Sequence, residues 1–118
     1  RVQYRETITA TAKQEGKYIK QTSNMNFYGH VIVEVTPLSR GEGFKFVNRT
    51  DYATIPKEFI NPIKEGIESA LTRGPVRRYP VIDIKVALKG GSFSKDDSND
   101  IAFREAAREA TEEATEAC

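Results

Sequence analysis

A strand pattern flanked by two helical patterns constrains the fold of this chain most strongly. Residues 80–88, PVIDIKVAL, alternate strictly and place Ile82 and Ile84 on one face, which is the period of a β-strand. Amphipathic helical patterns precede it, over residues 55–73, and follow it, over residues 98–117. Because a single strand needs partners, the fold class depends on strands elsewhere in the chain.

Further strand patterns precede the first helix. Val2–Lys13 is rich in Thr, Tyr, Val and Ile, and after a turn at Gln14–Gly16 we expect Lys17–Gln21 to form the return arm of a hairpin. His30–Pro37 alternates between apolar and polar side chains, and Phe44–Val47 is a short run of the same kind. The order is therefore strands, helix, strand, helix, which is typical of an α+β fold.

Both helical stretches carry signals at their ends. Pro62 is expected in the first turn of the main helix, after a short turn opened by Ile55-Pro56, and Gly74-Pro75 ends that helix. One of residues 98–100, each with a side-chain oxygen, caps the last helix. The apolar face of the last helix is small, which favours close packing on a sheet; it comprises Phe103, Ala106, Ala107, Ala110, Ala114 and Ala117.

We therefore predict one domain over residues 1–118, a two-layer α+β sandwich with a mostly antiparallel four-stranded sheet and both helices on one face. If the strands near Val47 and Val81 are parallel neighbours, the general rule expects a right-handed crossover between them. The chain starts at Arg1 instead of Met and stops at Cys118 inside a helical pattern, so we expect it to be a piece of a larger multidomain protein.

Composition excludes several classes of protein. One Cys excludes a disulfide framework and a Cys-rich zinc site, and no apolar run approaches the roughly 18–20 residues of a membrane span, so we expect a cytoplasmic protein without membrane contact. The net charge is only +1, but residues 98–118 carry −4 and residues 1–97 carry +5. Either the acidic helix is a solvated surface, or a basic body meets a polyanion with that helix turned away.

No residues form a convincing catalytic, cofactor-binding or metal-binding set. His30 is the only His, and a structural or hydrogen-bonding role is favoured for it over catalysis. Asp83 and Lys85 are expected to form a solvent-facing ion pair on their strand. Residues 96–100 lack the Gly and Glu of a calcium loop and fit helix capping better, and Gly90-Gly91-Ser92 lacks the lysine of a phosphate-binding loop.

Two loops are candidates for contact with RNA. Residues 23–28 and 90–97 combine small polar residues with the aromatics Phe27, Tyr28 and Phe93, which suits irregular RNA with splayed bases, although ordinary loops have similar compositions. Nearby basic residues are candidates for phosphate contacts, or alternatively form a solubilising edge: Arg73, Arg77, Arg78, Lys85 and Lys89.

The chain resembles domain IV of bacterial elongation factor G over nearly its whole length. The motifs that carry the resemblance are YRETI at 4–8, GKYIKQT at 16–22, YGHV at 28–31, EVTPL at 34–38, GFKFVN at 43–48, IPKEFI at 55–60, KEGIE at 64–68, YPVIDIKV at 79–86 and GSF at 91–93. The resemblance implies an α+β sandwich with a left-handed βαβ crossover, which replaces the right-handed expectation.

The resemblance also implies a function. The parent would be a translational GTPase whose GTP and Mg²⁺ site lies in a domain absent here, so this segment is no enzyme. Its domain IV would enter the decoding region of the small ribosomal subunit and contact tRNA and mRNA during translocation, beside other domains of the same chain. The matching tip positions are Ser23, Asn24, Met25, Asn26, Phe27, Tyr28, Gly29 and His30, then Gly91, Ser92, Phe93, Ser94, Lys95 and Asp96.

The tip departs from the family pattern. Residues 23–27, SNMNF, stand where the family typically has Gly-Gly-Arg-Gly-Gln, and Ser94 stands where it typically has His. One alternative is therefore a paralogue used in ribosome recycling or ribosome protection. Alternatives of another class are a spacer between domains and a small ligand-binding or enzymatic α+β domain, which would need a pocket with converging polar groups.

Overall fold

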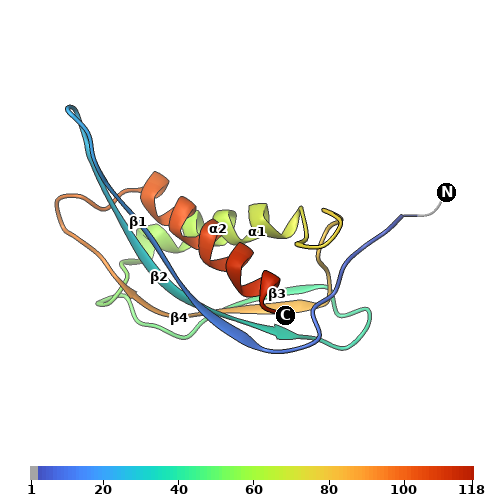
Figure 1. The fold of residues 1–118 in the computed structure, drawn as a ribbon. Helices are drawn as coiled ribbons and strands as arrows, with labels where there is room; N and C mark the ends of the chain where they lie inside the picture. Colours follow the sequence, from blue (N-terminus) through green and yellow to red (C-terminus); the bar gives the residue numbers. More distant parts are fainter. Residues whose placement is uncertain (1–2) are drawn as a thin grey trace.

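The elements alternate between one sheet and two helices that cover it. The computed structural model describes residues 3–118. In chain order it contains β1 (Ala12–Gln21), β2 (Asn26–Pro37), β3 (Phe44–Asn48), the 3-10 helix η1 (Lys57–Phe59), α1 (Ile60–Leu71), β4 (Ile84–Ser92) and α2 (Asp100–Glu116). Both helices lie on the same face of the sheet (Figure 1), which confirms the predicted two-layer α+β sandwich.

The sheet has four strands in the order β1-β2-β4-β3. β1 and β4 pair antiparallel with β2, whereas β3 pairs parallel with β4. α1 connects β3 to β4, and in Figure 1 the chain rises from the left end of the distant β3, runs rightwards through α1 and returns along the nearer β4. This path is a left-handed crossover, as the resemblance implied and against the general rule.

Close approach of α2 to the sheet is made possible by two glycines. A Cβ atom on Gly16 of β1 would lie 2.1 Å from the Ala106 carbonyl oxygen, and one on Gly29 of β2 would lie 2.2 Å from that of Ala102. The small alanine face of α2 and these glycines therefore bring backbone against backbone. α1 also touches α2 closely, because Gly66 faces the carbonyl oxygen of Arg104.

The predicted first hairpin, with its turn at Gln14–Gly16, is wrong. Residues 3–11 form no strand beyond a single bridge between Glu6 and Val81, and Val2 lies outside the described residues. β1 runs unbroken through the expected turn at Gln14–Gly16 and turns back only after Gln21. Gly16 is needed for the contact with α2 and not for a turn, which explains the error.

The strand predicted over residues 80–88 lies further along the chain. β4 starts at Ile84 and continues through Gly90 to Ser92, in the region expected as a loop. The shift arises because Asp83 adopts a positive φ of 55°, which breaks the extended backbone before β4. Asp83 is 5% exposed and its carboxylate accepts hydrogen bonds from the N–H groups of Gly41 (3.1 Å) and Gly43 (2.8 Å), so the expected ion pair with Lys85 is wrong.

The helix ends agree with the sequence. η1 precedes α1, and Pro62 lies in the first turn of α1. Asn99 is the cap of α2, since its side-chain oxygen accepts a hydrogen bond from the N–H of Ala102 at 2.8 Å. Ala117 lies beyond the last residue of α2 and is exposed, so its expected place on the apolar face of this helix is wrong. Within residues 3–118, no helix combines the length and the apolar character needed to cross a membrane.

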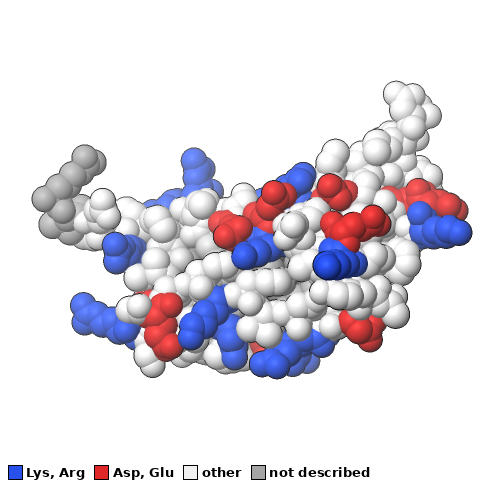
Figure 2. Space-filling view, turned by 180° about the vertical axis from the view of Figure 1, so that it is seen from behind, with Lys and Arg blue, Asp and Glu red and all other residues white. Residues whose placement is uncertain are grey.

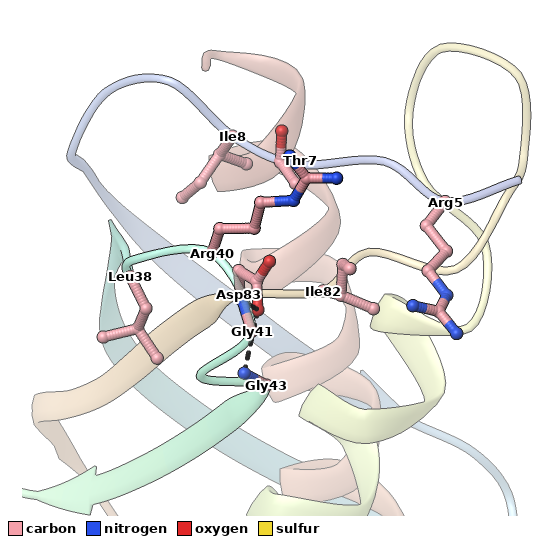
Figure 3. Close-up of a pocket in the computed structure, with 9 residues that line it drawn as sticks. All are labelled: Arg5, Thr7, Ile8, Leu38, Arg40, Gly41, Gly43, Ile82 and Asp83. Carbon is pink, nitrogen blue, oxygen red and sulfur yellow. Dashed lines mark hydrogen bonds between the residues drawn. The ribbon is translucent and has the colours of Figure 1, made fainter.

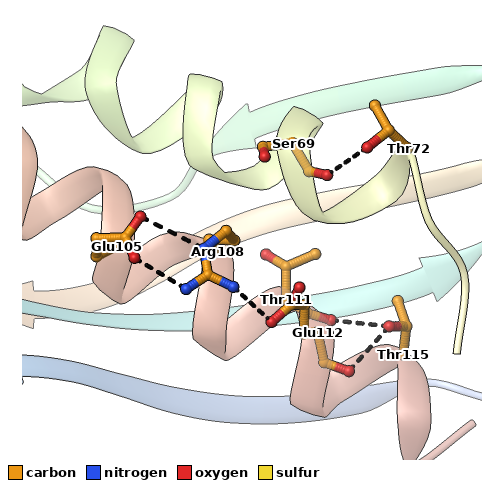
Figure 4. A network of polar contacts seen from close by, with 7 residues as sticks. All are labelled: Ser69, Thr72, Glu105, Arg108, Thr111, Glu112 and Thr115. Carbon is orange, nitrogen blue, oxygen red and sulfur yellow. Dashed lines mark hydrogen bonds and ion pairs between the residues drawn. The ribbon is translucent and has the colours of Figure 1, made fainter.

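The acidic charge of α2 is partly compensated within the helix layer. Arg108 forms ion pairs of 2.8 Å with both Glu105 and Glu112 (Figure 4), and Arg104 pairs with Glu65 of α1 at 3.1 Å. These pairs raise the pKa of Arg108 and lower that of Glu105. The acidic segment therefore lies in the helix layer, away from the uncovered face of the sheet (Figure 1).

Candidate nucleic-acid interface at the tip

The β1–β2 hairpin projects from the body as a narrow tip (Figure 1). Thr22 closes its turn: the hydroxyl accepts hydrogen bonds from the N–H groups of Asn24 (3.3 Å) and Met25 (2.9 Å) and donates to the Met25 carbonyl at 2.6 Å. The Thr22 N–H also donates to that carbonyl. The turn is thus built by a hydroxyl side chain instead of by glycines.

The second loop, residues 93–99, lies against the start of β2, close to the hairpin turn. The Tyr28 N–H donates to the Asp97 carbonyl (3.0 Å), and the Ser98 hydroxyl donates to the Tyr28 carbonyl (2.8 Å). Asn99 reaches the Asn26 carbonyl at 3.4 Å. The two loops that the sequence singled out therefore meet and form one surface.

Ser94 shapes the second loop from within. Its N–H donates to the Ser98 hydroxyl (2.9 Å), its carbonyl accepts from the Ser98 N–H (3.0 Å), and its own hydroxyl accepts from the Asp97 N–H (3.3 Å). The hydroxyl is half-buried, so Ser94 stabilises the loop and offers little to an outside partner.

A groove of about 480 Å³ lies between the two loops. It is lined by Thr22, Ser23, Asn24, Met25, Asn26, Asp96, Asp97, Ser98 and Asn99. Residues 21–28 carry no charge, and the projecting tip is white in Figure 2. Amides, hydroxyls and two carboxylates suit base edges and ribose hydroxyls, whereas phosphates need cations.

Two apolar side chains are presented to solvent at this end. Met25 at the turn is 48% exposed and Phe93 in the second loop is 39% exposed. Phe27, by contrast, is half-buried and packs edge-on against Tyr18, with ring centroids 5.9 Å apart. Gly29 is buried under α2, so the expectation that it belongs to the contact surface is wrong.

A hydrogen-bonded chain crosses the sheet at the base of the hairpin. The Ser92 hydroxyl lies 2.7 Å from both the Tyr28 hydroxyl and His30 Nδ1, and His30 Nε2 lies 2.5 Å from Glu15 Oε2. The hydrogen bond from His30, assisted by Lys17 and opposed by partial burial, lowers the pKa of Glu15. The predicted hydrogen-bonding role of His30 is confirmed.

Several residues of this region were not predicted from the sequence. Ser98 and Thr22 join or line the loops, and Glu15 completes the chain to His30. Thr22-Ser23-Asn24 fits a side-chain-closed turn, a signal that could have identified Thr22. Nothing in the sequence places Glu15 beside His30, because that contact depends on the register of β1 against β2.

The three candidate arginines do not lie near the tip. Arg73, Arg77 and Arg78 are exposed on the segment between α1 and β4, at the opposite end of the molecule (Figure 1). The expectation that they neighbour the tip loops is wrong. Lys89 is exposed on β4, and Lys85 is half-buried beside Lys45 of β3.

A groove at the other end of the molecule offers no converging set of polar groups. It measures about 690 Å³ and lies at the end away from the tip, with Arg5, Arg40 and Asp83 in its lining. Figure 3 shows the Arg40 guanidinium extending toward Thr7 while that of Arg5 points elsewhere. The carboxylate of Asp83 is already bound by backbone N–H groups. Among residues 3–118, no three His, Cys, Asp or Glu side chains gather around a possible metal position.

Comparison with known proteins decides the family. A family model for elongation factor G, domain IV, matches residues 1–118. The chain belongs to the elongation factor G domain IV family. It is 47% identical over 105 residues to elongation factor G of Aquifex pyrophilus, which covers 89% of this chain and 15% of that protein.

A solved structure shares the domain IV fold. The crystal structure of ttk003000868 from Thermus thermophilus matches with a TM-score of 0.91 at 36% identity, covering 98% of this chain and 17% of that one. The domain IV sequence thus spans about a sixth of the length of these longer relatives.

Proposed function

We propose that this chain is the arm of a translation elongation factor that enters the decoding region of the small ribosomal subunit. There its two tip loops contact tRNA and mRNA and promote their movement. The observation that supports this most directly is that both loops form one exposed surface at the end of a projecting hairpin whose residues 21–28 carry no charge. Membership of the domain IV family supports it independently.

The chemistry of the tip favours contacts with bases and ribose. Exposed bases stack on aromatic and apolar side chains, and Phe93 and Met25 are available for this. The amides of Asn24 and Asn26 and the carboxylates of the second loop supply donors and acceptors for base edges and 2′-hydroxyls. Phosphate contacts would come from other parts of the factor or from Lys89 and Lys95.

The proposed function assigns nucleotide binding and hydrolysis to other parts of a longer protein. We propose that GTP and Mg²⁺ are bound outside this sequence and that the factor works in the cytoplasm, where ribosomes are found. On this proposal, the present segment takes no part in the chemistry of hydrolysis and acts by position and contact alone.

Substitution of an exposed tip residue tests the proposal. In the full-length factor, Phe93→Ala should slow single-turnover translocation about tenfold, because loss of one stacking contact costs about 1–3 kcal/mol. Ribosome-stimulated GTP hydrolysis, measured in the same mixture, should stay within about twofold of the unchanged factor.

A matched control separates the tip from a general surface effect. Tyr52, which is 56% exposed between β3 and η1, loses a similar aromatic group in Tyr52→Ala. This control should translocate at the normal rate. Equal rates for the Phe93 variant and the Tyr52 variant would contradict the proposed role of the tip.

Complementation distinguishes the main translocase from a paralogue. The full-length protein should support growth of cells depleted of elongation factor G. Failure to do so, together with activity in ribosome splitting, would assign it to recycling instead.

A further inference from the structure

We propose that Glu15, His30 and Ser92 are positioning residues that fix the tip hairpin against the second tip loop through the hydroxyl of Tyr28. The inference rests on the proposed function, because it assigns these residues to the same tip. Glu15, His30 and Ser92 do not themselves form the proposed contact surface of the two tip loops. They act on that surface through Tyr28.

The four side chains link three strands. Ser92 ends β4, Tyr28 and His30 lie on β2, and Glu15 lies on β1. Their polar atoms are joined by consecutive distances of 2.7, 2.7 and 2.5 Å. Gly16 and Gly29 face α2, and side chains alternate along a strand, so Glu15, Tyr28 and His30 lie on the face that the helices leave uncovered. Ser92 pairs directly with His30 and therefore lies on that face too.

The chain of hydrogen bonds has a consistent direction. With a neutral ring, the Tyr28 hydroxyl donates to Ser92, the Ser92 hydroxyl donates to Nδ1 of His30, and Nε2–H of His30 donates to Glu15. The chain ends on a carboxylate whose lowered pKa keeps it charged, and hydrogen bonds to a charged acceptor are the stronger kind. His30 is only 17% exposed, so water competes weakly for its ring.

The position of this network shows that it restrains the hairpin beyond the end of β4. Beyond Ser92, β4 leaves the sheet, and only β1 and β2 continue to the turn. Gly91, with a φ of 151°, lets the end of β4 approach the His30 carbonyl, where a Cβ would clash at 2.2 Å. The network is therefore a side-chain connection across three strands at the point where the sheet narrows to the two strands of the hairpin.

Tyr28 carries this restraint to both loops. Its backbone N–H and carbonyl bind Asp97 and Ser98 of the second loop, while its hydroxyl binds Ser92. Anchoring the ring of Tyr28 thus restricts the hairpin and the second loop at one residue. Loss of the anchor should loosen both loops together.

Hydrogen exchange on the full-length protein tests the proposal without ribosomes. Ser92→Ala removes the central hydroxyl, and exchange of the amides over residues 22–28 and 93–98 should rise about tenfold. Ser92→Thr keeps a hydroxyl and should restore protection. Ser69→Ala on α1, far from the network, is the matched control and should leave both loops unchanged.

A spectroscopic readout follows the network itself. The ¹⁵N shifts of the His30 ring, assigned by the signal lost in His30→Gln, should show Nδ1 as a hydrogen-bonded acceptor and Nε2 as protonated. Ser92→Ala should shift Nδ1 toward the free acceptor value, and Glu15→Gln should change Nε2 and raise loop exchange moderately.

Each outcome decides the inference. Faster exchange confined to the two loops supports it, whereas unchanged loop exchange in both Ser92→Ala and Glu15→Gln overturns it. Uniformly faster exchange through β3 and α1 also overturns it, since the residues would then stabilise the whole domain. Looser loops with normal translocation would retain the positioning role and contradict the proposed function instead.

Discussion

Asp83 combines two unusual features at one residue, a positive φ and a buried carboxylate that holds the 41–43 turn. Asp and Asn tolerate this backbone conformation better than other non-glycine residues do. Asp83→Ala should therefore lower the free energy of unfolding by about 2 kcal/mol, because two N–H groups lose a charged acceptor.

Urea denaturation measures the effect of the Asp83 substitution. Asp83→Asn keeps an acceptor and a tolerated backbone, so its loss should be at most about half as large. A solvent-facing ion pair with Lys85 would predict little change in either variant, and that result would contradict the structural role.

Glu6 should make stability depend on pH in a defined direction. Burial opposes its charge, but the N–H groups of Arg77, Val76 and Tyr79 and the nearby Arg78 outweigh this and lower the pKa of Glu6 from 4.5. Its contribution to stability is therefore complete above about pH 4.5 and is lost as the pH falls through the lower folded value.

The pH effect is measured as a difference between variants. Glu6→Gln should unfold more easily than the unchanged chain at pH 7, and the gap should close toward pH 3. Glu113→Gln, at an exposed site on α2, is the control and should show no such gap at either pH. A gap that widened in acid would contradict the assignment.

At the scale of elements, Gly16 and Gly29 allow α2 to lie close to the sheet, because neither has a side chain to hold it away. Gly16→Ala should destabilise the fold by about 2–3 kcal/mol, because the new methyl group would overlap the Ala106 carbonyl and push α2 away. Gly90→Ala is the control, since its Cβ would meet only Ile32 at 3.7 Å. Thermal denaturation should show a clear loss for the first and a change within about 0.5 kcal/mol for the second.

The ends of an element could be predicted from the sequence where neighbouring residues determine them, and could not where contacts distant in sequence do. Pro62 and Asn99 act on neighbouring backbone groups, so the helix ends were predicted well. The ends of β1 and β4 depend on contacts distant in sequence, Gly16 with α2 and Asp83 with the 41–43 turn, and the sequence pattern placed them wrongly.

The same distinction applies to the candidate site. The two loops were found from their small polar and aromatic residues, and the structure brings them together. The sequence could not show that Phe27 packs on Tyr18, that Gly29 is buried, or that the three arginines lie at the other end. Each of these depends on strand register or on the path of the whole chain.

On the scale of the molecule, one continuous core joins all the layers. It extends from Ile8 through the central strands and both helices to Ala114. We therefore expect a single cooperative unfolding transition in urea, with an m-value of about 1–3 kcal/mol/M. Coincident curves from circular dichroism and tyrosine fluorescence would support this, and two separate transitions would contradict it.

The hairpin projects from the domain and is held by it at one end (Figure 1). Its root lies where α2 packs on Gly16 and Gly29, and its outer end lies beyond Lys20 and Phe27, where Asn26 contacts the second loop. Between this root and the turn, residues 16–21 of β1 and 26–29 of β2 are extended without a break. Because extended backbone joins the outer end to this packed root, we expect a force applied at the tip to be passed on to the body of the domain.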